Sequence, residues 1–103
     1  MKTVTDYSGR EVRITDERLA HILEHREMDG MAEAIECTLQ QPAEVRRSKA
    51  DDTVKLFYDF QSDTIVGGKW LCVVVRYTVE DAFVITAYLT DKIKAGESIW
   101  PTK

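Results

Sequence analysis

The sequence lacks the long apolar run of a membrane protein and the apolar leader of a secreted one. Its longest uninterrupted apolar stretch, Trp70–Val75, is six residues, whereas a helix that spans a bilayer needs about 20. The N-terminal stretch MKTVTDYSGREV lacks the hydrophobic segment of a signal peptide. We therefore expect no membrane span and a cytoplasmic protein.

Cysteine, proline and glycine are all scarce. The chain has 2 Cys, 2 Pro and 5 Gly among 103 residues, of which 44% are hydrophobic, and this composition argues against disordered and fibrous proteins. Cys37 and Cys72 lie far apart, outside any CxxC motif and among apolar neighbours. This placement predicts that both are reduced thiols buried as small hydrophobic side chains, with no disulfide and no zinc knuckle. We expect one globular domain, residues 1–103.

A surplus of basic charge is also missing. The formal net charge is −4, whereas proteins that bind polyanions use many Lys and Arg side chains to neutralise phosphates. The charge is uneven, however: the segment Ala43–Thr78 has 6 basic and 5 acidic residues. Arg46, Arg47 and Lys49 are clustered there, so this middle third of the chain is the part best suited to a phosphate group.

Familiar nucleotide and hydrolase motifs are absent. The sequence contains no GxGxxG, no Walker loop and no GxSxG. Dehydrogenase, nucleoside triphosphatase and serine hydrolase functions therefore lose support.

Two helices are predicted in the first half of the chain. Thr15 or Asp16 can cap a helix whose apolar residues Leu19, Ile22 and Leu23 recur at helical spacing. A second apolar stripe runs from Met31 to Leu39, and Pro42 ends it. Before them, Thr3–Tyr7 and Arg10–Ile14 flank Ser-Gly and are compatible with a short hairpin.

The second half predicts four strands. The stretches EVRRSK, VKLFYDF, KWLCVVVRYT and AFVITAYLT alternate or are continuously apolar, and short turns separate them. Short turns join antiparallel neighbours. We therefore predict an α+β fold in which two N-terminal helices pack on one face of a four-stranded antiparallel sheet.

His21 and His25 lie one helical turn apart at the edge of the buried stripe. Such a pair can bind zinc, but a catalytic zinc site needs a third protein ligand, and HILEH lacks the glutamate of HExxH. Two boundary histidines that half-cover the core are a simple alternative. We expect no metal and no other cofactor.

A third interpretation joins His21 to residues of the predicted sheet. A histidine base, cationic groups and hydroxyl donors together can cleave an RNA phosphodiester without a metal. The strand residues that supply such groups are Arg46, Arg47, Lys55, Arg76, Thr86, Tyr88 and Thr90. Threonine and tyrosine also favour strands for structural reasons alone.

Several collinear stretches resemble one superfamily. They are ITDERLAHILEH, IECTLQQPAEVRRSK, VKLFYDF, WLCVVVRY and FVITAYLTDKIKAGESIW, which together run from Ile14 to Trp100. This series resembles the phage- and mobile-element-associated nuclease domains of the Barnase, EndoU, Colicin and RelE-like superfamily, a group that includes toxin ribonucleases. The resemblance implies a metal-independent endoribonuclease with helices packed on a four-stranded antiparallel sheet.

The resemblance also implies roles for individual residues. The helix-one histidine corresponds to His21, with His25 as the second candidate. The basic strand residues correspond to Arg46 and Arg47, and less directly to Lys55 and Arg76; the last-strand hydroxyl corresponds to Thr86, with Tyr88 beside it. As catalytic residues we predict His21, Arg46, Thr86 and Tyr88, and as substrate-binding residues His25, Arg47, Lys55 and Arg76.

Two further possibilities concern the partners. The substrate is expected to be tRNA or ribosome-associated RNA, and a toxin would have a separate antitoxin chain as partner. Alternatively, the domain is a non-catalytic protein-binding or regulatory module that uses its exposed sheet face or an edge strand. The sequence leaves the oligomeric state open.

Overall fold

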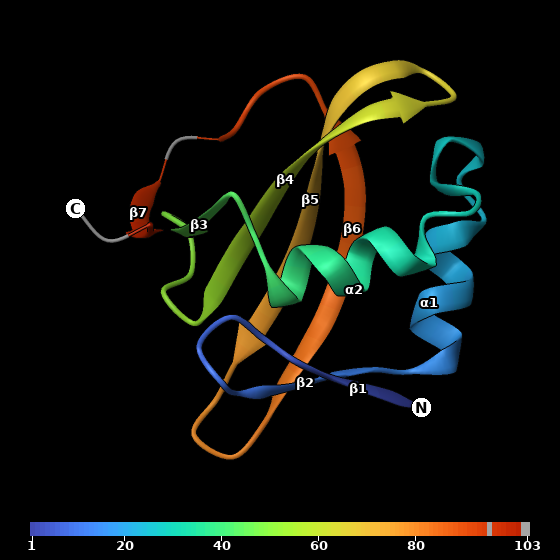
Figure 1. The fold of residues 1–103 in the computed structure, drawn as a ribbon. Helices are drawn as coiled ribbons and strands as arrows, with labels where there is room; N and C mark the ends of the chain where they lie inside the picture. The colour runs from blue at the N-terminus through green and yellow to red at the C-terminus, as the bar shows by residue number, and fades with distance from the viewer. Residues whose placement is uncertain (95, 102–103) are drawn as a thin grey trace.

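The computed structural model describes residues 1–94 and 96–101. Figure 1 shows the elements in chain order: β1 (Lys2–Thr5), β2 (Glu11–Ile14), α1 (Asp16–Leu23), the 3₁₀ helix η1 (Arg26–Met28), α2 (Ala32–Gln40), β3 (Glu44–Arg47), β4 (Val54–Thr64), β5 (Gly67–Tyr77), β6 (Ala82–Thr90) and β7 (Glu97–Trp100).

The two predicted helices are confirmed, and their ends follow from local chemistry. The Thr15 hydroxyl accepts a hydrogen bond from the Arg18 backbone N–H at 3.1 Å, so Thr15 is the N-cap of α1. Asp16 and Glu17 in the first turn favour the same end of the helix dipole. The second helix ends at Gln40, two residues before the proline that stops it.

The strands of the second half pair as a meander. β4 pairs antiparallel with β5, and β5 with β6. β3 is antiparallel to β4 on its other side. The four predicted strands are therefore neighbours in the order in which they follow one another along the chain.

The predicted sheet size and type are wrong, because the sheet has seven strands and is mixed. Its order is β1-β2-β6-β5-β4-β3-β7. The N-terminal hairpin forms, and β2 then adds to β6 in parallel at the pair Arg13 and Phe83. β7 adds to the outer edge of β3. These three added strands have four residues each, too few to show an alternating pattern, and their pairing in the sheet depends on distant segments.

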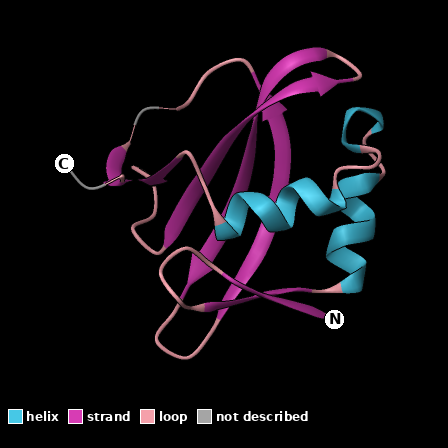
Figure 2. Ribbon diagram, in the orientation of Figure 1, coloured by secondary structure: helices cyan, strands magenta, loops and turns pink. Residues whose placement is uncertain are grey.

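The two faces of the sheet differ. α2 crosses in front of the long strands in Figure 2, and both helices add apolar side chains, such as Ile22, Ile35 and Leu39, to the larger core on this side. We call it the helix face. The opposite side, which we call the open face, carries the smaller core of Val54, Leu56, Tyr58 and Cys72. Cys72 is buried as predicted, whereas the prediction is wrong for Cys37, which is exposed on α2. Within the described part of the chain, no helix is both long enough and apolar enough to cross a membrane.

Candidate functional site

The two histidines lie away from the strand residues with which they were grouped. His21 on α1 is exposed, its Nδ1 is 3.6 Å from Glu24 Oε2, and its ring centroid is 6.3 Å from that of His25. An open hollow of about 340 Å³ beside His21 is lined by Thr15, Glu17, Arg18 and His21. These neighbours of His21 belong to α1, to its N-cap and to the residues that follow it.

Among the described residues there is no group of three or more His, Cys, Asp and Glu side chains that can hold a metal ion. The histidine pair therefore lacks the third ligand that a zinc site needs.

The predicted cationic and hydroxyl residues are divided between the two faces of the sheet. Arg46 and Thr86 belong to one cross-strand row, Arg46–Leu56–Val74–Thr86, and this row lies on the open face with Leu56 and Val74. Three strand spacings separate the two residues, or about 14 Å. Tyr88 is on the same face, beside Cys72. Arg76 is also on the open face, where it pairs with Asp51.

Arg47 and Lys55 lie on the helix face. They are cross-strand partners on β3 and β4, and Lys55 contacts Tyr77 of the larger core. Successive residues of a strand point to opposite faces, which is why Arg46 and Arg47 are separated. Arg46 and Thr86 thus share the open face about three strand spacings apart, whereas Arg47 lies on the helix face.

A polar cluster surrounds Tyr77 where the β1–β2 loop packs against the ends of β4 and β5. We call it the Tyr77 cluster; it consists of Asp6, Tyr7, Arg10, Lys55 and Tyr77. The Lys55 ammonium lies 4.4 Å from the centroid of the Tyr77 ring, and the Arg10 guanidinium carbon lies 5.2 Å from it. These are cation–π distances.

The Asp6 carboxylate connects the β1–β2 loop to Tyr77 by hydrogen bonds. It is only 5% exposed, and its Oδ2 accepts a hydrogen bond from the Tyr77 hydroxyl at 2.5 Å. Its Oδ1 accepts from the Ser8 backbone N–H and hydroxyl, both at 2.8 Å, and from the Arg10 N–H at 3.0 Å. Both oxygens of the buried carboxylate thus accept hydrogen bonds, and these bonds hold the β1–β2 loop in place.

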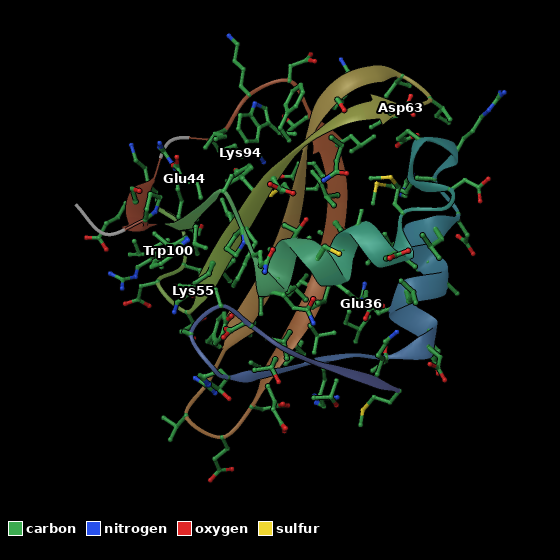
Figure 3. The ribbon with its side chains drawn as sticks, viewed as in Figure 1. Glu36, Glu44, Lys55, Asp63, Lys94 and Trp100 are labelled. Carbon is green, nitrogen blue, oxygen red and sulfur yellow. The ribbon has the colours of Figure 1, made fainter. Side chains whose placement is uncertain are left out.

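Two further residues form the rim of the cluster. Arg47 is Lys55's neighbour on β3 and pairs with Glu97 at 2.5 Å. Trp100 is 38% exposed, and its ring centroid is 5.3 Å from that of Tyr7. Figure 3 shows Lys55 and Trp100 close to the β3–β7 end of the sheet, across the view from α1.

The surroundings of Lys55 lower the pKa of its ammonium group. Desolvation by burial lowers the pKa of Lys55, and the positive charges of Arg47 and Arg10 lower it further, while Asp6 acts in the opposite direction. Among the described residues, no carboxylate forms an ion pair with Lys55. Burial and the neighbouring Asp6 raise the pKa of Tyr77.

A second cluster occupies the open face. We call it the Tyr88 cluster; it consists of Arg46, Tyr58, Cys72, Tyr88 and Lys94. The Lys94 ammonium lies 5.2 Å from the Tyr88 ring centroid. The Lys94 backbone N–H donates to the Tyr58 hydroxyl at 3.1 Å, and Arg46 donates to the Lys94 carbonyl at 3.4 Å.

The titratable groups at the centre of the Tyr88 cluster stay protonated at neutral pH. Burial raises the pKa of Tyr58, Cys72 and Tyr88. A thiol or phenol with a raised pKa is a poor proton acceptor near neutrality. The Tyr77 cluster is therefore the better candidate for acid–base chemistry.

The sequence reasoning missed most of the Tyr77 cluster. It named Lys55 and Arg47, but not Asp6, Tyr7, Arg10, Tyr77 or Trp100. One local signal was present: in DYSGR an aspartate precedes Ser-Gly, a pattern typical of a turn that the aspartate side chain closes. No pattern in the sequence pairs that turn with Tyr77, 71 residues further along the chain.

Comparisons of the chain with models of protein families, with curated proteins and with solved structures found no match. The resemblance to the Barnase, EndoU, Colicin and RelE-like superfamily is therefore still a prediction.

Proposed function

We propose that this protein is a metal-independent endoribonuclease and that the Tyr77 cluster is its active site. The observation that supports the proposal is the position of the Lys55 ammonium, 4.4 Å above the Tyr77 ring with a lowered pKa and flanked by two arginines. A general base works best when its pKa lies near the operating pH. The resemblance of the sequence to toxin ribonucleases points to the same reaction.

The reaction that suits these groups is transesterification within RNA. Lys55 in its neutral form accepts the proton of a ribose 2′-hydroxyl, whose oxygen attacks the adjacent phosphorus. The bond from phosphorus to the 5′-oxygen breaks, and water supplies the proton that this oxygen takes up. The hydroxide that remains takes the proton from Lys55, which restores the neutral base. Arg10 and Arg47 stabilise the charge that develops on the phosphoryl oxygens, and the products end in a 2′,3′-cyclic phosphate and a 5′-hydroxyl.

The rim of the cluster adds a surface for a base. The exposed edge of Trp100 and the adjoining Tyr7 ring are able to stack on an unpaired nucleobase. We propose tRNA or ribosome-associated RNA as the substrate class, a cytoplasmic location, and an antitoxin chain as the partner of a toxin-like activity.

The test is cleavage of a defined single-stranded RNA by the purified protein in the presence of EDTA. We expect the Lys55→Met variant to lose activity about 100-fold or more, the contribution typical of a general base. Lys49→Met is the matched control because Lys49 is an exposed lysine outside the cluster. We also expect His21→Ala and Arg46→Ala to cleave like the natural protein, since neither residue touches the cluster.

Two outcomes contradict this assignment. If the Lys55→Met variant cleaves at the natural rate, Lys55 is not the base. If His21→Ala abolishes cleavage while Lys55→Met does not, the reaction takes place beside α1.

A second candidate function is a protein-binding module. It is favoured by exposed apolar side chains at the far end of the β4–β5 hairpin, where Phe60 is 50%, Ile65 64% and Val66 50% exposed. Such a patch is typical of a protein–protein contact. Retention of a cellular protein by the natural chain but not by an Ile65→Ser, Val66→Ser double variant, together with no RNA cleavage in EDTA, would favour this function over the nuclease.

A further inference from the structure

Two aromatic side chains stand together on the open face, beside the Tyr88 cluster. Phe60 on β4 and Trp70 on β5 are cross-strand partners, and their ring centroids are 5.4 Å apart in an edge-to-face arrangement. Phe60 is 50% exposed, and Trp70 is partly buried. We call this pair the aromatic platform.

The Phe60 ring lies over Gly68 of the neighbouring strand β5. A Cβ atom added to Gly68 would lie 2.9 Å from Phe60 Cζ, so the ring lies against a strand position that has no side chain. The Phe60 side chain is nevertheless 50% exposed. An exposed aromatic ring beside a second one offers a surface on which a nucleobase can stack.

Basic residues adjoin the platform. Trp70 pairs with Thr90 at the end of β6, and the segment that follows includes Lys92 and Lys94. In the part of the chain that the structure describes, neither lysine forms an ion pair with a carboxylate. The nearby Asp91 pairs with Lys69, and the Lys94 ammonium lies over the Tyr88 ring on the same face, so the segment after β6 brings positive charge to the open face although the protein as a whole is acidic.

We infer that the open face binds a single-stranded segment of RNA, with bases stacked on Phe60 and Trp70 and phosphates bound by Lys92 and Lys94. Exposed aromatic rings on a sheet, next to basic side chains, bind unpaired bases with little sequence preference. Local positive charge favours a polyanion over an apolar protein surface. The inference rests on the proposed function, since this face would hold substrate outside the reaction site.

The chain has 2 Trp residues: Trp70 in the aromatic platform and Trp100 at the rim of the Tyr77 cluster. In a Trp100→Phe variant, Trp70 on the platform is the only tryptophan, and in a Trp70→Phe variant Trp100 beside the Tyr77 cluster is the only one. The probe is a single-stranded 2′-O-methyl RNA oligonucleotide of mixed sequence, because its blocked 2′-oxygen prevents cleavage. Each variant is titrated with it, and tryptophan fluorescence is recorded.

We expect the oligonucleotide to quench the fluorescence of the Trp100→Phe variant. Adding Phe60→Ala, or replacing both Lys92 and Lys94 by Met, should weaken the apparent affinity about tenfold. The same sequence annealed to its complement should not quench Trp70, because its bases are already stacked. A circular dichroism spectrum like that of the natural protein verifies the fold of each variant.

The possible failures are distinguishable. Quenching of Trp100 in the Trp70→Phe variant without quenching of Trp70 would overturn the open-face inference and leave the proposed function intact. Quenching of Trp70 combined with no cleavage by the natural protein would support RNA binding on this face and remove the nuclease. Quenching of Trp70 that is unchanged by Phe60→Ala and by the double lysine variant would overturn the inference.

Discussion

The Tyr77 cluster and the Tyr88 cluster each place a lysine ammonium over a tyrosine ring, on opposite faces of one sheet. The lysine–ring distance is 4.4 Å in the first and 5.2 Å in the second. In the Tyr77 cluster a nearly buried carboxylate, Asp6, accepts the tyrosine hydroxyl. In the Tyr88 cluster the neighbour of the tyrosine is the buried Cys72 thiol.

The difference lies in where the charge is placed. Lys55 is half-buried on the rigid strand β4, among two arginines, and its pKa is lowered. Lys94 is exposed and follows β6 in the segment that leads to β7. The same pair of residue types thus suits proton transfer on the helix face and attraction of phosphate on the open face.

The largest effect that we expect is a loss of stability at alkaline pH, to which tyrosines of both clusters contribute. The pKa values of Tyr58, Tyr77 and Tyr88 are all raised from the ordinary value of 10.0. The folded protein therefore holds these protons more tightly than the unfolded chain. The stabilisation is fully present below pH 10.0 and is lost as the pH rises towards the folded-state pKa values, by about 4 kcal/mol per pH unit for three groups.

Urea denaturation at a series of alkaline pH values measures this slope. In the Tyr77→Phe variant one group is removed from the helix face, so the slope should fall by about 1.4 kcal/mol per pH unit, and in the Tyr58→Phe, Tyr88→Phe double variant it should fall by about 2.7 kcal/mol per pH unit. Phenolate absorbance that rises below pH 10.0 while the protein is still folded would contradict the raised pKa values.

A smaller effect concerns the carboxylate that only the Tyr77 cluster has. Asp6→Ala removes the acceptor of four hydrogen bonds and leaves the buried Tyr77 hydroxyl unpaired. We expect a loss of about 3 kcal/mol in the free energy of unfolding. The matched change on the open face, Tyr58→Phe, removes one hydrogen bond, from the Lys94 N–H, and should cost about 1 kcal/mol.

Both variants are measured by urea denaturation at pH 7. If Asp6→Ala costs no more than Tyr58→Phe, the carboxylate does not hold the β1–β2 loop in the way described, and the two clusters are equivalent in stability.

Sequence patterns predicted the elements that repeat over many residues. The apolar spacing of Leu19 to Leu23, the Thr15 cap and the stop before Pro42 identify α1 and α2, and alternation identifies β4 and β6. The short strands gave no such repeat. The parallel addition of β2 to β6 and the addition of β7 to β3 depend on contacts between distant segments, which local patterns do not encode.

The candidate site was less predictable than the fold, for a related reason. Arg46 and Arg47 were grouped because they are adjacent in sequence, yet adjacency in a strand separates side chains. His21 and Thr86 were grouped by their chemistry and by the resemblance, and no local pattern places them side by side. The residues that do meet, Asp6 and Tyr77, are joined only by the packing of the β1–β2 loop on the sheet.

The smallest effect that we expect concerns the contact between Phe60 of the aromatic platform and Gly68. Gly68→Ala would place a methyl group 2.9 Å from Phe60 Cζ. That atom is the end of a side chain that is 50% exposed, so the ring can move away. Alanine also replaces a flexible glycine in a strand, so the free energy of unfolding should change by less than about 0.5 kcal/mol.

The position of the ring should change even though stability does not. In a Trp100→Phe background, Gly68→Ala should shift the emission of Trp70, because the Phe60 ring is its edge-to-face neighbour at 5.4 Å. Gly9→Ala is the control. No heavy atom lies within 4 Å of the added Cβ, but the φ of 92° at this position is unfavourable for any residue with a side chain. Stability should therefore fall, and Trp70 emission should stay unchanged. An unchanged Trp70 emission in Gly68→Ala would mean that Phe60 is not held against Gly68, and the open face would then lack the ordered surface that distinguishes it from the Tyr77 cluster.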